Sequence, residues 1–235
     1  MLKGLQLAKA MGFKTGIVTN NYWATTTEDA KLWLEPIIES GIDNLSLSDD
    51  AFHNNETEEN SANIAANAAN KLGFSANSIC IEKPSIQPPS DDKGAPVVGG
   101  GALFKGRAVE KLTNGLPTKS VENFVECKHE ELETPKRVHI DSFGNVQVCQ
   151  GVSIGNMWQK SLSQIISEYN AKKHPICGPV SSGGPYELAQ KCDVKLAGKF
   201  IDECHYCYTI RRALINDFPE YLTPLQVYGL SNSVN

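Results

Sequence analysis

The sequence lacks three features that would place it in common protein classes. No apolar run approaches the roughly 20 residues that a membrane span needs, and the N-terminal stretch MLKGLQLAKAMGFK has no long apolar region followed by a small-residue cleavage site. Basic residues are not in excess, because 22 Lys and Arg oppose 27 Asp and Glu for a net charge of -5. Neutralising nucleic acid phosphates needs a basic face. We therefore expect a soluble, cytoplasmic protein whose partners are neither membranes nor nucleic acids.

The composition is that of a folded protein with reduced cysteines. The chain has 235 residues, of which 40% are hydrophobic and 21% charged, which suits one large globular domain or one and a half smaller ones. Its seven cysteines are an odd number, and a chain of this size needs no disulfides to fold. A reduced, metal-binding role is therefore favoured over a disulfide framework.

The first third of the chain alternates helical patterns with short apolar runs. The expected helices cover 2–11, a stretch from a cap at Thr26 or Thr27 to Gly41, and 61–72; the expected strands are 15–20, 44–48 and 78–82. The first strand has the composition of a strand buried on both faces. Strands and helices that alternate at this spacing predict a parallel α/β fold, either part of a barrel or an open sheet.

The pattern changes in the middle of the chain. An acidic, polar loop is expected at 49–60 and a long loop or lid at 84–101, where Pro, Gly, Ser and Asp are frequent. Residues 103–112 are expected to turn a last barrel strand into a helix. The remainder predicts a hairpin and helices at 161–169, 186–192 and 204–216, so we divide the chain into domains 1–114 and 115–235.

Cysteines suggest a metal centre in the second part. Val138–Asn156 predicts a β-hairpin that turns at Gly144 and carries Cys149 at its rim. Cys204-x2-Cys207 is a chelating pair, because two intervening residues let both sulfurs face one ion, and Cys127 lies upstream. Buried cysteines that act as small hydrophobes are one alternative. Structural zinc is another, although one tight pair with two isolated cysteines suits an iron–sulfur cluster at least as well.

The other candidate residues favour simpler roles. We expect core packing for Cys80, and we expect Cys177 and Cys192 to be fillers rather than additional ligands. His205 lies between the paired cysteines and is expected to face outward. His53 is expected to be a solvated loop histidine, although it could face a substrate.

At this point the chain resembles the radical SAM enzymes. TGIVTNNYWA and GIDNLSLSDDAFH are similar to the middle strand ends of that family's barrel, and Cys127, Gly144-x4-Cys149 and Cys204-x2-Cys207 are similar to the SPASM or twitch extensions that hold auxiliary [4Fe-4S] clusters. The resemblance implies a partial parallel (β/α) barrel followed by a small α+β extension that carries the cysteines. It also implies an electron donor and, as the favoured class, a peptide or protein substrate.

The resemblance further implies a part of the S-adenosylmethionine site. Ser48 and Asp50 would lie near the ribose, whose diol suits a hydroxyl and a carboxylate, and Asn20 would line the same cavity. A helix cap or loop turn is the alternative for the Ser48 segment. Arg107 resembles a residue at the barrel exit, with a surface ion pair as the alternative.

Two family motifs are absent from this sequence. It has neither the Cys-x3-Cys-x2-Cys loop that binds the S-adenosylmethionine cluster nor the Gly-Gly-Glu strand end, and Asn21 replaces the usual glycine. We therefore expect a barrel that lacks its first strands, in a chain that by itself cannot cleave S-adenosylmethionine. It is either the C-terminal portion of such an enzyme or a non-catalytic iron–sulfur or zinc remnant that acts in electron transfer or partner binding. An incomplete barrel would expose an edge strand.

Overall fold

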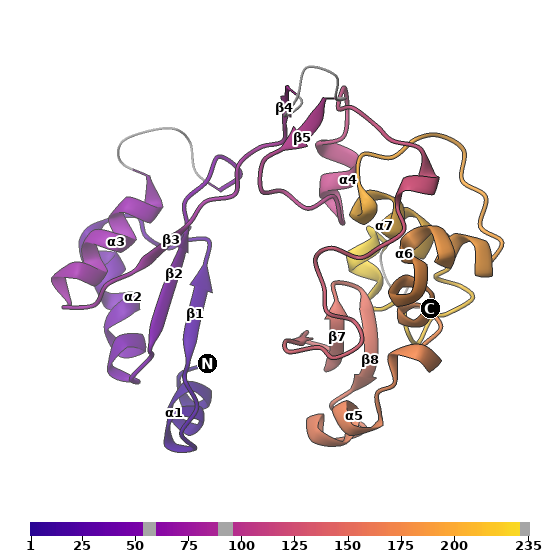
Figure 1. Ribbon diagram of the computed structural model, residues 1–235. Coiled ribbons are helices and arrows are strands. Elements are labelled where there is room, and N and C mark those ends of the chain that lie inside the picture. Colours follow the sequence, from indigo (N-terminus) through magenta and orange to yellow (C-terminus); the bar gives the residue numbers. More distant parts are fainter. Residues whose placement is uncertain (54–59, 89–95, 231–235) are drawn as a thin grey trace. The chain divides into compact units, whose positions relative to one another are not determined.

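The chain forms two compact units of mixed α/β structure. The computed structural model describes residues 1–53, 60–88 and 96–230, and its described strands form three small sheets (Figure 1). The first unit contains Met1–Lys83 and Gly100–Ala102; the second contains Pro84–Gly99 and Leu103–Asn235. The boundary expected at residue 114 stays a prediction. Within the described residues no helix is long and apolar enough to cross a membrane.

The first unit is built on the parallel sheet that the sequence predicts. Its strands are β1 (Gly16–Thr19), β2 (Asn44–Ser48) and β3 (Asn77–Ile79), in the order β1-β2-β3. Both pairs are parallel, with Ile17 opposite Leu45 in the first pair. Strand β2 is buried through its centre, as expected for a strand between two neighbours. The third strand is shorter than expected and ends before Cys80.

Three helices accompany this sheet, and local sequence signals fix where they start. They are α1 (Leu2–Ala10), α2 (Thr27–Glu39) and α3 (Ser61–Lys71). Thr26 caps α2 by accepting from the Asp29 N–H, as its side chain predicts. Helices α2 and α3 pack side by side on the sheet (Figure 1). The apolar core of the unit forms between them and β2. Part of the acidic loop expected at 49–60, residues 54–59, lies outside the described residues.

Strand β1 is an edge strand, which corrects the expectation that it is buried on both faces. Within the described residues it pairs only with β2, and Val18 leaves 68% of its surface exposed. The preceding helix α1 has no buried residue, and Leu7 and Met11 are also exposed. A strand with one free edge and an exposed apolar side chain is a template for pairing with another chain.

The second unit contains two antiparallel sheets. Strands β4 (Ser85–Gln87) and β5 (Val97–Gly99) pair with each other. The expectation of a loop over 84–101 is therefore wrong near both ends of that range, where the chain forms these strands. Residues 89–95 are not described. No strand forms at 103–112, where the chain passes directly into α4 (Arg107–Lys111). The predicted hairpin is confirmed as β6 (His139–Ile140) and β7 (Asn145–Cys149), and a third strand that was not predicted, β8 (Val152–Asn156), extends it.

Helices and short turns surround this second sheet. The helices are α5 (Leu162–Glu168), α6 (Cys177–Lys191) and α7 (Glu203–Ala213). The 3₁₀ turns are η1 (Val121–Asn123), η2 (Ala171–Lys173) and η3 (Leu225–Tyr228). The three expected helices are confirmed, but α6 begins earlier than predicted and is kinked at Gly183 and Gly184. These elements enclose one apolar core that contains Phe124, Leu188 and Ile210. The described residues form no closed barrel.

The free edge of β1 predicts self-association. We expect the purified chain to be oligomeric or poorly soluble, and Val18→Lys to shift it toward monomer because a charge on an edge strand blocks strand pairing. Size-exclusion chromatography with light scattering measures this. Leu32→Lys is the matched control, since Leu32 is 71% exposed but lies on α2. A wild-type chain that is already a monodisperse monomer would contradict the prediction.

Candidate metal centre

The β6–β7 turn holds Cys149 at the end of a rigid strand. The Asp141 carboxylate accepts hydrogen bonds from the N–H groups of Phe143 and Asn145 at 2.9 and 3.0 Å and from the side chain of Gln147 at 2.8 Å. Gly144 adopts φ 82°, and a Cβ atom there would lie 2.5 Å from the indole nitrogen of Trp158. The turn therefore needs glycine at this position, and the sequence motif Gly144-x4-Cys149 has a physical basis.

The loop that carries Cys127 is fixed by the kink in α6. Gly184 has φ 67°, and a Cβ atom there would lie 2.2 Å from the backbone nitrogen of Glu126. The Tyr186 N–H donates to the Phe124 carbonyl oxygen at 3.0 Å, and Phe124 is buried in the core. Because only glycine allows this approach, the break in α6 determines where Cys127 lies.

Helix α7 presents the two remaining predicted ligands. Asp202 caps it by accepting from the His205 N–H at 2.7 Å, so its first turn begins just before Cys204. Cys204 is buried and Cys207 half-buried, and residues three apart on a helix lie on neighbouring positions of one face. The spacing of the pair thus places both thiols on the same side of the helix.

The four predicted ligands all belong to the second unit, where Cys149 is part of the apolar core and Cys127 and Cys207 pack against it. Electrostatic interactions connect Cys207 to Cys149 and to Cys127, and Cys204 to Cys207 and to Cys149. A fifth thiol, Cys177 at the start of α6, interacts with Cys149 and Cys207. All seven cysteines are free. In the described part of the chain, however, no group of three or more His, Cys, Asp or Glu side chains is arranged to hold a metal ion.

Burial disfavours ionisation of the two thiols of α7. Desolvation raises the pKa of Cys204 to about 12 and that of Cys207 to about 11. Thiolates are the ligand form, so a bound metal would have to displace protons from these two sulfurs. The chemistry of the donor set suits a soft metal centre.

Two buried cations interact with these cysteines, and neither is apparent from the sequence. The Lys105 ammonium donates to the Cys149 sulfur at 3.4 Å. The Arg211 guanidinium donates to the Gln150 carbonyl oxygen at 2.8 Å. Burial alone would lower the pKa of Lys105, but its interactions with Cys149, Cys204 and Glu130 raise it overall. The signal that could have identified Arg211 is its place one helical turn after Cys207.

Other residues have roles that differ from the expected ones. Cys80 is exposed rather than packed in the core, because β3 ends before it. His205 does not face outward: its ring packs edge-on against Phe200 at 5.0 Å, and its Nδ1 accepts from the Ile201 N–H. Cys192, by contrast, is half-buried and packs against the core, in keeping with the filler role expected of it.

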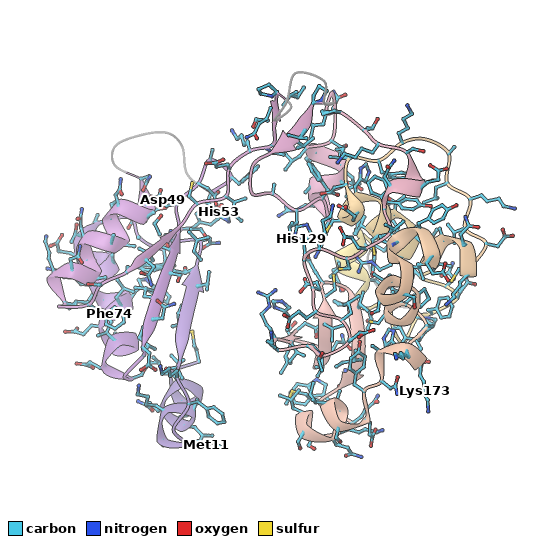
Figure 2. All side chains as sticks on the ribbon, viewed as in Figure 1. Met11, Asp49, His53, Phe74, His129 and Lys173 are labelled. Atoms are coloured by element: carbon cyan, nitrogen blue, oxygen red, sulfur yellow. The ribbon has the colours of Figure 1, made fainter. Side chains whose placement is uncertain are left out.

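The residues predicted to bind S-adenosylmethionine lie at the carboxyl end of the parallel sheet. Figure 2 shows Asp49 and His53 at the end of the first unit opposite Met11. Asp50 is buried, and its carboxylate accepts from the N–H groups of Phe52 at 3.0 Å and Ile81 at 3.3 Å. It also contacts the His53 ring at 2.8 Å. Asp50 thus links the ends of β2 and β3, and its role toward a ribose stays a prediction.

The other residues of this edge differ in exposure. Asn20 is exposed and Ser48 half-buried. Asn21, which follows Asn20, is fully buried and has φ 63°, a left-handed conformation that asparagine tolerates. Its side-chain nitrogen donates to the Ser48 carbonyl oxygen at 2.8 Å. Arg107 is exposed at the start of α4.

Comparisons with known proteins add no identification. Neither the scan against protein-family models nor the search of curated proteins finds a match for this chain. The arguments about function therefore rest on the residues and contacts described above.

The contacts of Asp50 predict an acid-sensitive stability. Desolvation would raise its pKa, but hydrogen bonds from His53, Phe52 and Ile81 lower it overall. Because the pKa of Asp50 is lower in the folded state than in the unfolded state, where it is about 3.9, the ionised carboxylate stabilises the fold at pH values above the unfolded-state pKa. This stabilisation is lost as the pH falls through the folded-state pKa. We expect Asp50→Asn to lower the free energy of unfolding by about 1–3 kcal/mol at pH 7, and by less toward pH 3. Urea unfolding at several pH values measures this.

Asp49→Asn is the matched control for this variant. The Asp49 side chain is half-buried and, among the described residues, accepts a hydrogen bond from the Asn60 side chain at 3.0 Å, which an amide oxygen would also accept. Its free energy of unfolding should change by less than about 0.5 kcal/mol. Equal destabilisation by both variants would show that Asp50 has no special structural role.

Proposed function

We propose that this chain is part of a radical SAM iron–sulfur protein. In this proposal the first unit is a segment of the (β/α) barrel, and Cys127, Cys149, Cys204 and Cys207 of the second unit bind an auxiliary [4Fe-4S] cluster. The observation that carries the proposal is the Lys105 ammonium at 3.4 Å from the sulfur of Cys149, in a core against which Cys127 and Cys207 also pack. The parallel sheet, with polar residues at its carboxyl edge, supports the barrel part.

The charge balance of the second unit suits an anionic centre. Four thiolates around a metal carry net negative charge, which is costly to bury unless cations lie close. The side chain of Lys105 is 7% exposed, and Arg211 as a whole residue is 1% exposed. Both interact with Cys149 and Cys204. Neutral cysteines used only as core fillers would not need two buried positive charges beside them.

Each part of the chain would have a defined task. An auxiliary cluster supplies one-electron transfer when it is bound. The protein would fix the four sulfurs, exclude water through the surrounding core and offset the negative charge with Lys105 and Arg211. Asn20, Ser48 and Asp50 would contribute to the S-adenosylmethionine site of the full enzyme, which would modify a peptide or protein substrate by radical chemistry with electrons from a separate donor.

A second candidate is a non-catalytic protein with a structural zinc or with reduced cysteines alone. One observation favours it: Cys149 and Cys177 belong to the apolar core, and Cys127 and Cys207 pack against it. Free cysteines often fill cores in this way. In that case the second unit would serve partner binding without S-adenosylmethionine.

Metal analysis separates the two candidates. We expect protein purified and reconstituted without oxygen to contain about four irons, with matching sulfide, per chain. Cys149→Ala and Cys207→Ala should each lose most of the iron, because no predicted ligand can replace the missing thiolate. Iron and sulfide assays with visible absorption measure this outcome.

Cys80→Ala is the control for those variants, since Cys80 is exposed and belongs to the first unit. It should retain all of the iron. Colourless protein with stoichiometric zinc, or equal iron in all variants, would refute the iron–sulfur assignment.

The catalytic form of the proposal requires a motif that this sequence does not contain. We expect the coding DNA upstream of Met1 to encode an in-frame Cys-x3-Cys-x2-Cys loop followed by a Gly-Gly-Glu strand end. Sequencing that DNA tests the expectation. A stop codon directly before Met1 would instead favour the non-catalytic candidate.

A further inference from the structure

His174 is a buried histidine that joins two elements of the second unit. It is 6% exposed and lies in the chain between η2 and α6. Its Nε2 atom lies 3.0 Å from the Ser153 carbonyl oxygen in β8. Its Nδ1 atom lies 3.2 and 3.1 Å from the backbone nitrogens of Ile176 and Cys177, where α6 begins. The ring therefore connects the start of α6 to the sheet.

These contacts fix the protonation state of the ring. A carbonyl oxygen can only accept, so Nε2 must carry the hydrogen that is donated to Ser153. The N–H groups of Ile176 and Cys177 can only donate, so Nδ1 must be an unprotonated acceptor. They are free N–H groups of the kind that every helix start presents, and the apolar side chain of Ile176 cannot cap them. His174 therefore caps α6 only while its ring is neutral.

A proton on Nδ1 would remove this cap. The acceptor would become a third donor pointing at two N–H groups, and the positive ring would lie at the positive end of the helix dipole. Both effects disfavour the contact between His174 and the start of α6. A buried charge without a partner adds a further cost.

The titratable groups around His174 do not offset a positive ring. Tyr169 and Tyr221 pack edge-on against it at 6.1 and 4.7 Å between ring centroids. Strand β8 has no titratable side chain, and α6 contributes the Cys177 thiol, whose pKa burial raises to about 12. The charged side chains of the flanking segments are Lys160, Glu168, Lys172, Lys173 and Glu220. Three of these five are cations, so their net charge also opposes a positive ring.

The glycine kink gives the first half of α6 a hinge. The helix is interrupted at Gly183 and Gly184, and beyond the kink the Tyr186 N–H donates to the Phe124 carbonyl oxygen at 3.0 Å. The half before the kink is held at its start by the His174 ring. The first half can therefore move while the second half keeps its contact with Phe124.

We propose that His174 is a proton-operated latch that releases the first half of α6 from the sheet at acidic pH. Protonation of Nδ1 breaks its contacts with Ile176 and Cys177, and the segment before Gly183 opens toward solvent. The latch consists of protein groups alone, so it goes beyond the proposed function and does not depend on a cluster.

Burial determines the pH range in which the latch acts. It lowers the pKa of His174 below the ordinary value of 6.5, which a ring released into solvent would regain. The neutral ring fully stabilises the closed form above about pH 6.5, and this stabilisation is lost as the pH falls from there to the folded-state pKa. Opening takes up one proton in this range, so its equilibrium constant should rise about tenfold per pH unit.

The test is hydrogen–deuterium exchange of the purified full chain between about pH 7.5 and about pH 4.5, read by mass spectrometry on peptides from α6. After correction for the intrinsic pH dependence of exchange, protection of the first half of α6 should fall about tenfold per pH unit below about pH 6.5. Protection of the second half should change little. His174→Asn should abolish this pH dependence, because an amide oxygen caps the same N–H groups without titrating.

His139→Asn is the matched control, since His139 is exposed at the start of β6; it should keep the wild-type pH dependence. A local measurement is needed because burial also lowers the pKa of His205, which would contribute to global unfolding. Protection of the first half of α6 that does not change with pH, or that changes equally in His174→Asn, would overturn the latch.

Nitrogen NMR of the His174 ring in the wild-type chain keeps the proposal testable if His174→Asn does not fold. The chemical shifts report which ring nitrogen carries the hydrogen and at which pH the ring titrates. We expect the hydrogen on Nε2 and a ring that stays neutral below about pH 6.5. A hydrogen on Nδ1, or titration at the ordinary value, would refute the latch.

Discussion

Positive charge buried in the core of the second unit is the constraint on which the rest of that unit depends. Arg211 is permanently protonated and 1% exposed, and among the described residues its hydrogen-bond acceptors are neutral oxygens of Gln150, Cys207 and Tyr228. These acceptors belong to the turn after β7, to α7 and to η3, so the buried charge fixes these segments against one another. Burying such a charge is costly unless an anion lies close. Under the proposed function, the thiolates of a bound centre would supply that anion.

The first unit depends on a different constraint, which is the pairing of backbone groups. The backbone groups of β2 form hydrogen bonds on both sides, with β1 and with β3. Within the described residues, β1 pairs with another strand on one side only. The buried carboxylate of Asp50 connects the loop after β2 to the chain after β3 through two backbone N–H groups. Local contacts thus connect the residues at the carboxyl edge of the sheet, whereas β1 has one edge with no paired strand within the described residues.

Local signals were predictable from the sequence, and tertiary contacts were not. Strand β2 has the predicted bounds because its apolar residues are flanked by turn residues, and Thr26 caps α2 because its hydroxyl suits a free N–H. The Cys-x2-Cys spacing and Gly144 indicated the thiol neighbourhood. Lys105 and Gly184 could not be identified, because a lysine near cysteines and a glycine inside a helix become meaningful only when distant segments pack. The burial of β1 was misjudged because apolar composition does not reveal whether a strand pairs on one side or on both.

The glycine kink of α6 has a consequence for the order of assembly. The position of the Cys127 loop requires the close approach of the Glu126 backbone to Gly184, and the position of Cys204 requires helix α7. In zinc fingers the metal gathers close ligands and drives folding. Here the cysteines come from segments separated by tens of residues and held by a core of their own. Under the proposed function, an inorganic cluster would therefore enter an apoprotein that is already folded.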